Sequence, residues 1–173
     1  MPLKKPETMS LENKVWKTLL WIGLLFCVLV LSKYILFKKS PHYYKSYFAH
    51  EYKHYKVSEG WEHANLKPFS TIRLFSSDRV SAEYSYKNIG GNIIGFIPLG
   101  ILLPILLPFF RKFGWLIGAV FLFSLLFELT QLMTGIGAFD VDDLILNTTG
   151  GIIGFILYTI VNRVTGQEPE TVS

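Results

Sequence analysis

The sequence is short of cysteine and of acidic residues, with one Cys and 13 Asp and Glu among its 173 residues. The single cysteine, Cys27, lies within an apolar run, so no internal disulfide is expected. A glycine-rich phosphate loop, a cysteine cluster and a nucleophile elbow are also missing, which removes the common signatures of nucleotide, zinc and hydrolase sites. Charge is missing from long stretches as well, because residues 18–32, 89–110 and 144–161 carry no charged side chain.

These uncharged stretches predict membrane-spanning helices, since about 20 apolar residues cross the hydrocarbon core of a bilayer. The expected fold is an all-α, polytopic membrane bundle with four transmembrane helices, at residues 15–37, 89–110, 113–133 and 144–161, of which the third is apolar apart from one charge, Glu128. A cleaved signal peptide is the alternative for the first span. No small-residue cleavage site follows its apolar run, which favours a retained anchor. Three prolines in the second span, Pro98, Pro104 and Pro108, predict a kinked helix.

The distribution of basic residues predicts the orientation of the spans. Arg111 and Lys112 lie in the short connection between the second and third spans, whereas the connection between the third and fourth has no Lys or Arg. Short basic connections stay in the cytoplasm. We therefore expect a cytoplasmic N-terminal segment (1–14), an extracytoplasmic loop (38–88) and a cytoplasmic tail (162–173) in the cell membrane, although the loop itself is basic.

The loop holds nine of the 17 Lys and Arg residues. Next to membrane spans, lipid headgroups are the expected partner of these cations, and no nucleic acid is expected. Aromatic residues recur at helical spacing, at Tyr44, Phe48, Tyr52 and Tyr55. This stripe suits either a helix in the headgroup plane or a lid packed on the spans. His50 and His54 are four residues apart and could share a metal ion, but the sequence shows no third ligand, so no metal is predicted.

Polar side chains inside the spans are the candidates for function, because an ionisable group in a membrane is costly. Glu128 lies in the third span, and Gln131 follows on the same helical face. Asn92 lies near the start of the second span, and Asp143 and Asn147 lie near the start of the fourth. Both spans start on the same side of the membrane. The sequence thus predicts a polar cluster at one depth, between the second, third and fourth spans.

Each of these residues also has a structural interpretation. Asp140, Asp142 and Asp143 suit the cap of a helix N-terminus. Asn92 and Asn147 can link helices, and Glu128 can be a protonated acid bonded to Gln131 or to either asparagine. The pairs Gly91/Gly95 and Gly150/Gly154 predict close helix packing.

Several segments together resemble the VanZ-like family. They are NIIGFIPLG at 92–100, FELTQ at 127–131, DVDDLILN at 140–147 and GGIIG at 150–154, preceded by NLKPF at 65–69. The resemblance covers residues 65–161. The motif positions outside the polar cluster are Asn65, Pro68, Phe69, Phe96, Pro98, Gly100, Gly150 and Gly154. The resemblance implies a bacterial cell-envelope role connected with resistance to teicoplanin, a lipid-tailed glycopeptide. It implies no particular reaction.

The favoured hypothesis is a non-enzymatic protein that binds an amphipathic ligand at the outer leaflet, either a lipid-linked cell-wall precursor or the acyl tail of a lipoglycopeptide. Its candidate ligand-binding residues are Asn92, Glu128, Gln131, Asp140, Asp143 and Asn147. The rival is an intramembrane enzyme that modifies a lipid headgroup with Glu128 and Asp143 as acid and base. A small transporter is less favoured because the two halves show no internal repeat. No cofactor is expected, and the sequence predicts no oligomeric state.

Overall fold

The computed structural model describes residues 11–37, 39–77 and 81–166, and within them every regular element is a helix. Four helices are long: α1 (Leu11–Leu36), α6 (Gly91–Leu106), α7 (Phe113–Thr134) and α8 (Val141–Val164). The segment between α1 and α6 forms short helices: α2 (Pro41–Ser46), α3 (Val57–Glu62), α4 (Ser70–Phe75) and α5 (Ala82–Ser85), with single turns between some of them. The predicted all-α bundle is confirmed.

Four helical stretches are long and apolar enough to cross a membrane: Glu12–Leu36, Tyr86–Leu106, Phe113–Thr134 and Val141–Val164. Their bounds differ by a few residues from the predicted spans, and at two helix ends the cause is a local interaction. The second ends at Leu106 rather than at 110, because Leu107 precedes Pro108 and takes an extended conformation (φ −128°, ψ 102°). The fourth begins at Val141 rather than at 144, because the Asp140 side chain caps the helix by accepting a hydrogen bond from the Asp142 amide.

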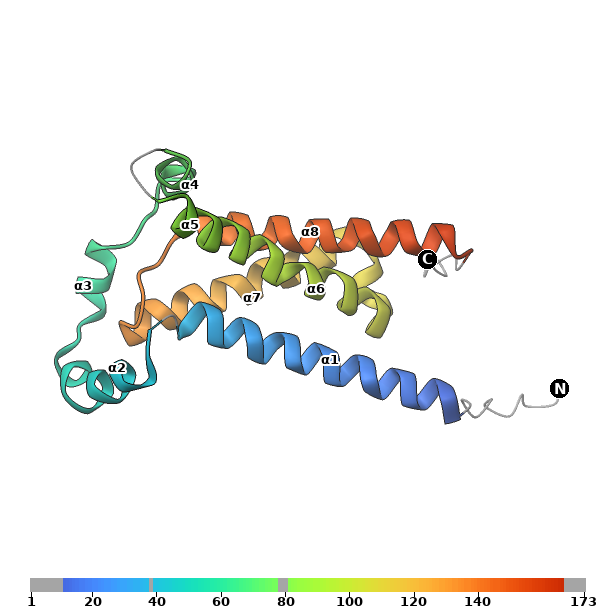
Figure 1. Ribbon diagram of the computed structural model, residues 1–173, viewed down its shortest axis with the longest axis horizontal. Coiled ribbons are helices and arrows are strands. Elements are labelled where there is room, and N and C mark those ends of the chain that lie inside the picture. Colours follow the sequence, from blue (N-terminus) through green and yellow to red (C-terminus); the bar gives the residue numbers. More distant parts are fainter. Residues whose placement is uncertain (1–10, 38, 78–80, 167–173) are drawn as a thin grey trace.

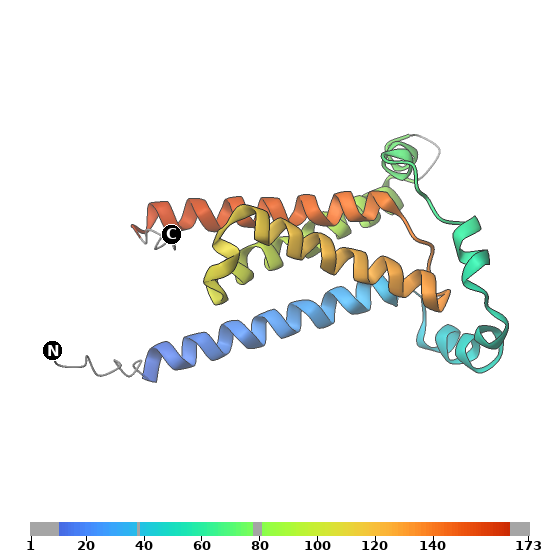
Figure 2. The same ribbon diagram turned by 180° about the vertical axis from the view of Figure 1, so that it is seen from behind.

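The helices run in alternating directions, so the bundle has two distinct ends (Figure 1). At one end α1 begins, α8 ends and α6 passes into α7. The other, called here the loop end, carries the short helices between α1 and α6 and the turn between α7 and α8. Figures 1 and 2 both show α1 leaning away from the other long helices toward its N-terminus.

Glycines bring α6 and α8 into backbone contact. A Cβ at Gly150 or Gly154 would overlap the carbonyl oxygen of Ile93 or Ile97 on α6, and one at Gly100 would overlap that of Gly151. The predicted close packing at Gly150 and Gly154 is therefore confirmed.

The same prediction is wrong for Gly91. No described atom lies within 4 Å of the place its Cβ would take, whereas a Cβ at Gly95 would lie 2.9 Å from Leu31 Cδ2 on α1. Gly91 faces open space, so close helix packing does not explain a glycine there.

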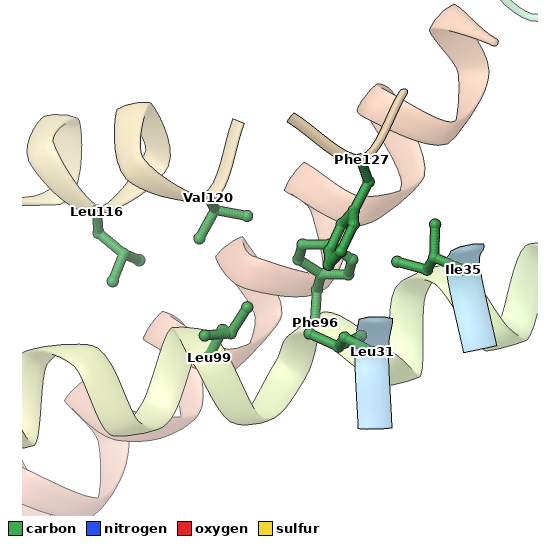
Figure 3. Packing of buried hydrophobic residues seen from close by; sticks show 7 residues of the cluster. All are labelled: Leu31, Ile35, Phe96, Leu99, Leu116, Val120 and Phe127. Atoms are coloured by element: carbon green, nitrogen blue, oxygen red, sulfur yellow. The ribbon is translucent and has the colours of Figure 1, made fainter. Parts of the chain in front are cut away.

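A hydrophobic core joins α1, α6 and α7. The motif residue Phe96 has no exposed surface and lies at its centre, facing Phe127 of α7 and Leu31 of α1 (Figure 3). The remaining buried members are Ile35, Leu99, Leu116 and Val120. By contrast Pro98, on the same helix as Phe96, is exposed.

The orientation of the bundle in the membrane leads to a direct prediction. With the loop end outside the cell, a cysteine at Ala138 should react with a membrane-impermeant thiol reagent in intact cells, and one at Lys112 should react only after lysis. Both native side chains are exposed, so either position is accessible from its own side. The measurement uses a Cys27→Ser background. Labelling of position 112 but not of position 138 in intact cells would show the opposite orientation.

Candidate functional site: a polar pocket at the loop end

A pocket of about 970 Å³ opens at the loop end between α1 and α6. One side is formed by the last turns of α1 and the other by the first turns of α6, while the α7–α8 turn and Asp143 close the space between them. Thr71 and Phe75 of α4 complete the lining. A volume of this size suits a ligand larger than an ion or a water cluster.

The polar wall of the pocket is built around Asn92 and Asp143. The Asn92 amide, only 8% exposed, donates a hydrogen bond of 2.5 Å from Nδ2 to Asp143 Oδ1. Asp140 and Gln131 also line the pocket, and Gln131 Nε2 donates to the Ile35 carbonyl oxygen at 2.9 Å. That carbonyl belongs to the last turn of α1 and has no partner within its own helix. Gln131 therefore fixes α1 against α7.

The apolar lining comes from both α1 and α6, and two cations lie at its edge. Leu31, Tyr34 and Ile35 of α1 face Ile94 of α6 across the space. Lys39 and Lys87 line the pocket beyond the ends of these helices. Lys87 makes an exposed ion pair of 2.6 Å with Glu83, and Lys39 Nζ lies 3.9 Å from the centre of the Tyr43 ring. Neither contact is strong at an exposed site.

The NLKPF segment ties the loop to the start of α8. Asn65 forms a parallel bridge with Asp140, and its amide Nδ2 donates to Asp140 Oδ1 at 2.8 Å. The Thr71 hydroxyl donates to the second oxygen, Asp140 Oδ2, at 2.6 Å. Since the Asp142 amide also bonds to Oδ1, both oxygens of the Asp140 carboxylate already accept hydrogen bonds. Asp140 is therefore mainly a structural anchor at the edge of the pocket.

Asp142 caps a helix other than its own. Its carboxylate is fully buried and accepts hydrogen bonds from the backbone amides of Phe69, Thr71 and Ile72, the N-terminus of α4. Phe69, which follows Pro68, has a positive φ of 66°, a strained conformation for a residue with a side chain. The sequence predicted a capping role within the fourth span for this aspartate. The cap instead holds α4 against the pocket.

Two of the predicted ligand-binding residues lie away from the pocket. Glu128 has no exposed surface, and its Oε2 accepts a hydrogen bond of 2.7 Å from the Asp140 amide at the start of α8. Asn147 is also buried, and its Nδ2 donates to Ser124 Oγ at 2.8 Å, which links α8 to α7. Of the two carboxylates proposed as an acid–base pair, only Asp143 lines the pocket.

The aromatic stripe divides between two environments. Tyr44 is buried and donates to the Leu36 carbonyl oxygen, and Tyr55 donates to that of Leu132. Phe48 and Tyr52 are each 41% exposed. Tyr44 and Tyr55 cover the ends of α1 and α7 as a lid, which favours the packing interpretation for this half of the stripe. The interfacial interpretation stays a prediction for Phe48 and Tyr52.

One lid residue, Tyr47, escaped the sequence pattern. It is buried, and its hydroxyl donates to the Thr134 carbonyl oxygen. Burial raises the pKa of Tyr47 and of Tyr55, so both phenols stay protonated and able to donate. Their contribution to docking of the lid is complete below the unfolded pKa near 10 and is lost as the pH rises through the raised values.

His50 and His54 lie in the same loop segment as the lid tyrosines. His50 Nδ1 lies 3.2 Å from the Ser46 carbonyl oxygen, and the described residues contain no group of three potential ligands.

The profile of the VanZ/LLP1 family matches residues 21–162, which is most of the sequence. The chain belongs to the VanZ/LLP1 family. It is 35% identical over 106 residues to Protein VanZ from Enterococcus faecium, a match that covers 60% of this chain and 57% of that protein. No solved structure matches. The four apolar helices and this family membership identify a multi-pass membrane protein.

Several residues that line the pocket were not predicted from the sequence, and membership of the VanZ/LLP1 family does not by itself identify them. Among them are Tyr34, Lys39, Lys87 and Gly91, together with Thr71 and Phe75 of α4. For Gly91 the spacing to Gly95 pointed to helix packing, and only the structure shows that it faces open space. Lys39 and Lys87 resemble the other exposed lysines of a basic loop and gave no signal.

Proposed function

We propose that this protein binds an amphipathic ligand of the bacterial cell envelope in the pocket between α1 and α6, at the outer leaflet of the cell membrane. The ligand is a lipid-linked cell-wall precursor or the acyl tail of a lipoglycopeptide, and the family resemblance supports a link to teicoplanin resistance. The single observation that carries the proposal is the pocket's division into a polar wall at Asn92 and Asp143 and an apolar lining from α1 and α6. Such a division matches a molecule with a polar head and an apolar chain.

The environment of the carboxylates favours binding over catalysis. An intramembrane enzyme with Glu128 and Asp143 as acid and base needs both groups within hydrogen-bonding reach of one ligand. Glu128 is completely buried and bonds to the backbone at the start of α8. A binding protein needs only Asp143 and its partner Asn92 at the pocket, with Glu128 as support for the turn that forms one wall.

Gly91 provides a test that leaves the rest of the fold intact. Gly91 lines the pocket and has open space at its Cβ position, so the Cβ of Gly91→Leu can be accommodated and the rest of the side chain should occupy part of the pocket. We expect the purified chain in nanodiscs to lose at least about tenfold in affinity for a fluorescent single-chain amphiphile, about 1.4 kcal/mol.

Gly90→Leu is the matched control. Gly90 also has open space at its Cβ position, but it does not line the pocket, so the leucine variant should bind like the unmodified chain. In cells the same pair should separate in teicoplanin susceptibility at equal membrane levels. Equal binding by both variants and the unmodified chain would refute the proposed pocket.

A further inference from the structure

The chemistry of the pocket changes in the same order along both walls. Lys87 lies in the π-helical turn Tyr86–Gly90 before α6, and Asn92, Ile94 and Gly95 follow in the first turns of α6. On α1, Lys39 comes after Ile35, whose carbonyl oxygen accepts from Gln131, and Leu31 lies one turn deeper. From the loop end inward, the pocket therefore has a cationic layer, a hydrogen-bonding layer and an apolar layer.

The hydrogen-bonding layer is dominated by acceptors with negative charge. Asp143 and Asp140 both line it, and an ionised carboxylate accepts hydrogen bonds but donates none. Asp143 already accepts from Asn92, and a carboxylate has room for several donors. An anionic group at this depth would meet repulsion from both carboxylates, whereas a hydroxyl or amide N–H would gain a charge-assisted hydrogen bond.

The cationic layer has the opposite preference. Lys39 and Lys87 are exposed, and their present partners are a tyrosine ring and the exposed carboxylate of Glu83. Contacts of this kind are weak in water, so an anion can displace them at small cost. Lys39 follows α1 and Lys87 precedes α6, so the two cations reach the pocket from different helices, and a phosphate held by both would neutralise part of both charges.

Resting on the proposed function, we infer that the ligand is an amphiphile in which the apolar chain is followed first by an uncharged hydrogen-bond donor and only then by an anionic group. The chain lies against Leu31 and Ile94, the donor reaches Asp143, and the anion lies between Lys39 and Lys87. This order excludes amphiphiles whose phosphate joins the chain directly. Of the two ligand classes proposed above, it therefore excludes cell-wall precursors linked to an isoprenoid chain through phosphate and keeps the lipoglycopeptide. It also assigns the two lysines a role in selecting the ligand.

Competition by simple amphiphiles tests the order of the layers. The full chain in phosphatidylcholine nanodiscs is loaded with the fluorescent amphiphile and titrated with lauroyl lysophosphatidic acid, which carries chain, hydroxyl and phosphate in that order. Dodecyl phosphate lacks the hydroxyl, lauroyl lysophosphatidylcholine masks the phosphate with a cation, and glycerol 3-phosphate lacks the chain. We expect lysophosphatidic acid to compete about tenfold better than either chain-bearing comparison, as one charge-assisted contact provides, and glycerol 3-phosphate not to compete.

Three variants test which layer of the pocket causes each ligand preference. Lys39→Gln with Lys87→Gln should remove the advantage of lysophosphatidic acid over lysophosphatidylcholine. Asp143→Asn should reduce its advantage over dodecyl phosphate. Glu83→Gln frees Lys87 from its ion pair, so the affinity for lysophosphatidic acid should rise about twofold.

The outcomes separate this inference from the proposed function. If all three chain-bearing compounds compete equally and Gly91→Leu still abolishes their binding, the layered order is wrong while the pocket stands. If Gly91→Leu changes nothing, the proposed function fails as well. Competition by glycerol 3-phosphate as strong as by lysophosphatidic acid would show a site for a soluble anion, which also overturns the inference.

Discussion

Gly154→Ala is expected to destabilise the protein by about 3 kcal/mol, because an added methyl group forces a tightly packed interface apart. Gly154 packs against the α6 backbone, where its Cβ would overlap the Ile97 carbonyl oxygen and lie 2.9 Å from Gly100 Cα. Backbone atoms cannot rotate out of the way as a side chain does. The helices α6 and α8 must therefore separate, which also shifts Asn92 relative to Asp143. Thermal unfolding of the purified chain in mild detergent measures the loss.

Gly118→Ala on α7 is the matched control. No described atom lies within 4 Å of a Cβ at Gly118, so the substitution should be neutral or stabilise the protein by up to about 1 kcal/mol through helix propensity. Equal unfolding temperatures for Gly154→Ala and Gly118→Ala would contradict the backbone contact between α6 and α8.

Asp142→Asn is expected to have the second large effect, a loss of about 3 kcal/mol, because buried backbone donors would lose a charged acceptor. The amide that replaces one carboxylate oxygen is itself a donor. It would face the N–H groups of Phe69, Thr71 and Ile72, of which it can satisfy only some. We expect α4 to detach and the strained conformation of Phe69 to relax. Hydrogen exchange of residues 65–75 should rise strongly while α6, α7 and α8 stay protected.

The neighbouring Asp143→Asn variant is the control for this change. It removes the same charge from the adjacent position, but Asp143 is only half-buried and bonds to a side chain. Hydrogen exchange of 65–75 should stay normal, while ligand binding weakens. Slow exchange of this segment in Asp142→Asn would show that the cap is not what holds α4.

Much of the architecture follows from the sequence, because lipid imposes simple rules. Long apolar runs with few charges predicted the four helices, and Gly150 and Gly154 predicted the α6–α8 contact. The predictions were wrong at helix ends, because a single local interaction determines the residue at which a helix begins or ends. Pro108 ends α6 early, and the Asp140 cap starts α8 early.

The site was predictable in part. Asn92 and Asp143 enter their helices from the same side, and the structure pairs them. Glu128 shares their depth but is buried, since the sequence gives depth along a helix more readily than the direction of a side chain. The position of the pocket also differs from the expectation of a site among the second, third and fourth spans. It lies beside α1, and no motif indicated which helices α1 contacts.

The location of a bound amphiphile is the most direct test of the central claim. A cryo-electron microscopy map of the full chain in nanodiscs, with lauroyl lysophosphatidic acid added and with a binding fragment for alignment, would show it. The account predicts density between α1 and α6, with a polar atom of the ligand within hydrogen-bonding distance of Asp143. Density only at lipid-facing surfaces, beside an empty pocket whose walls are as described, would contradict it.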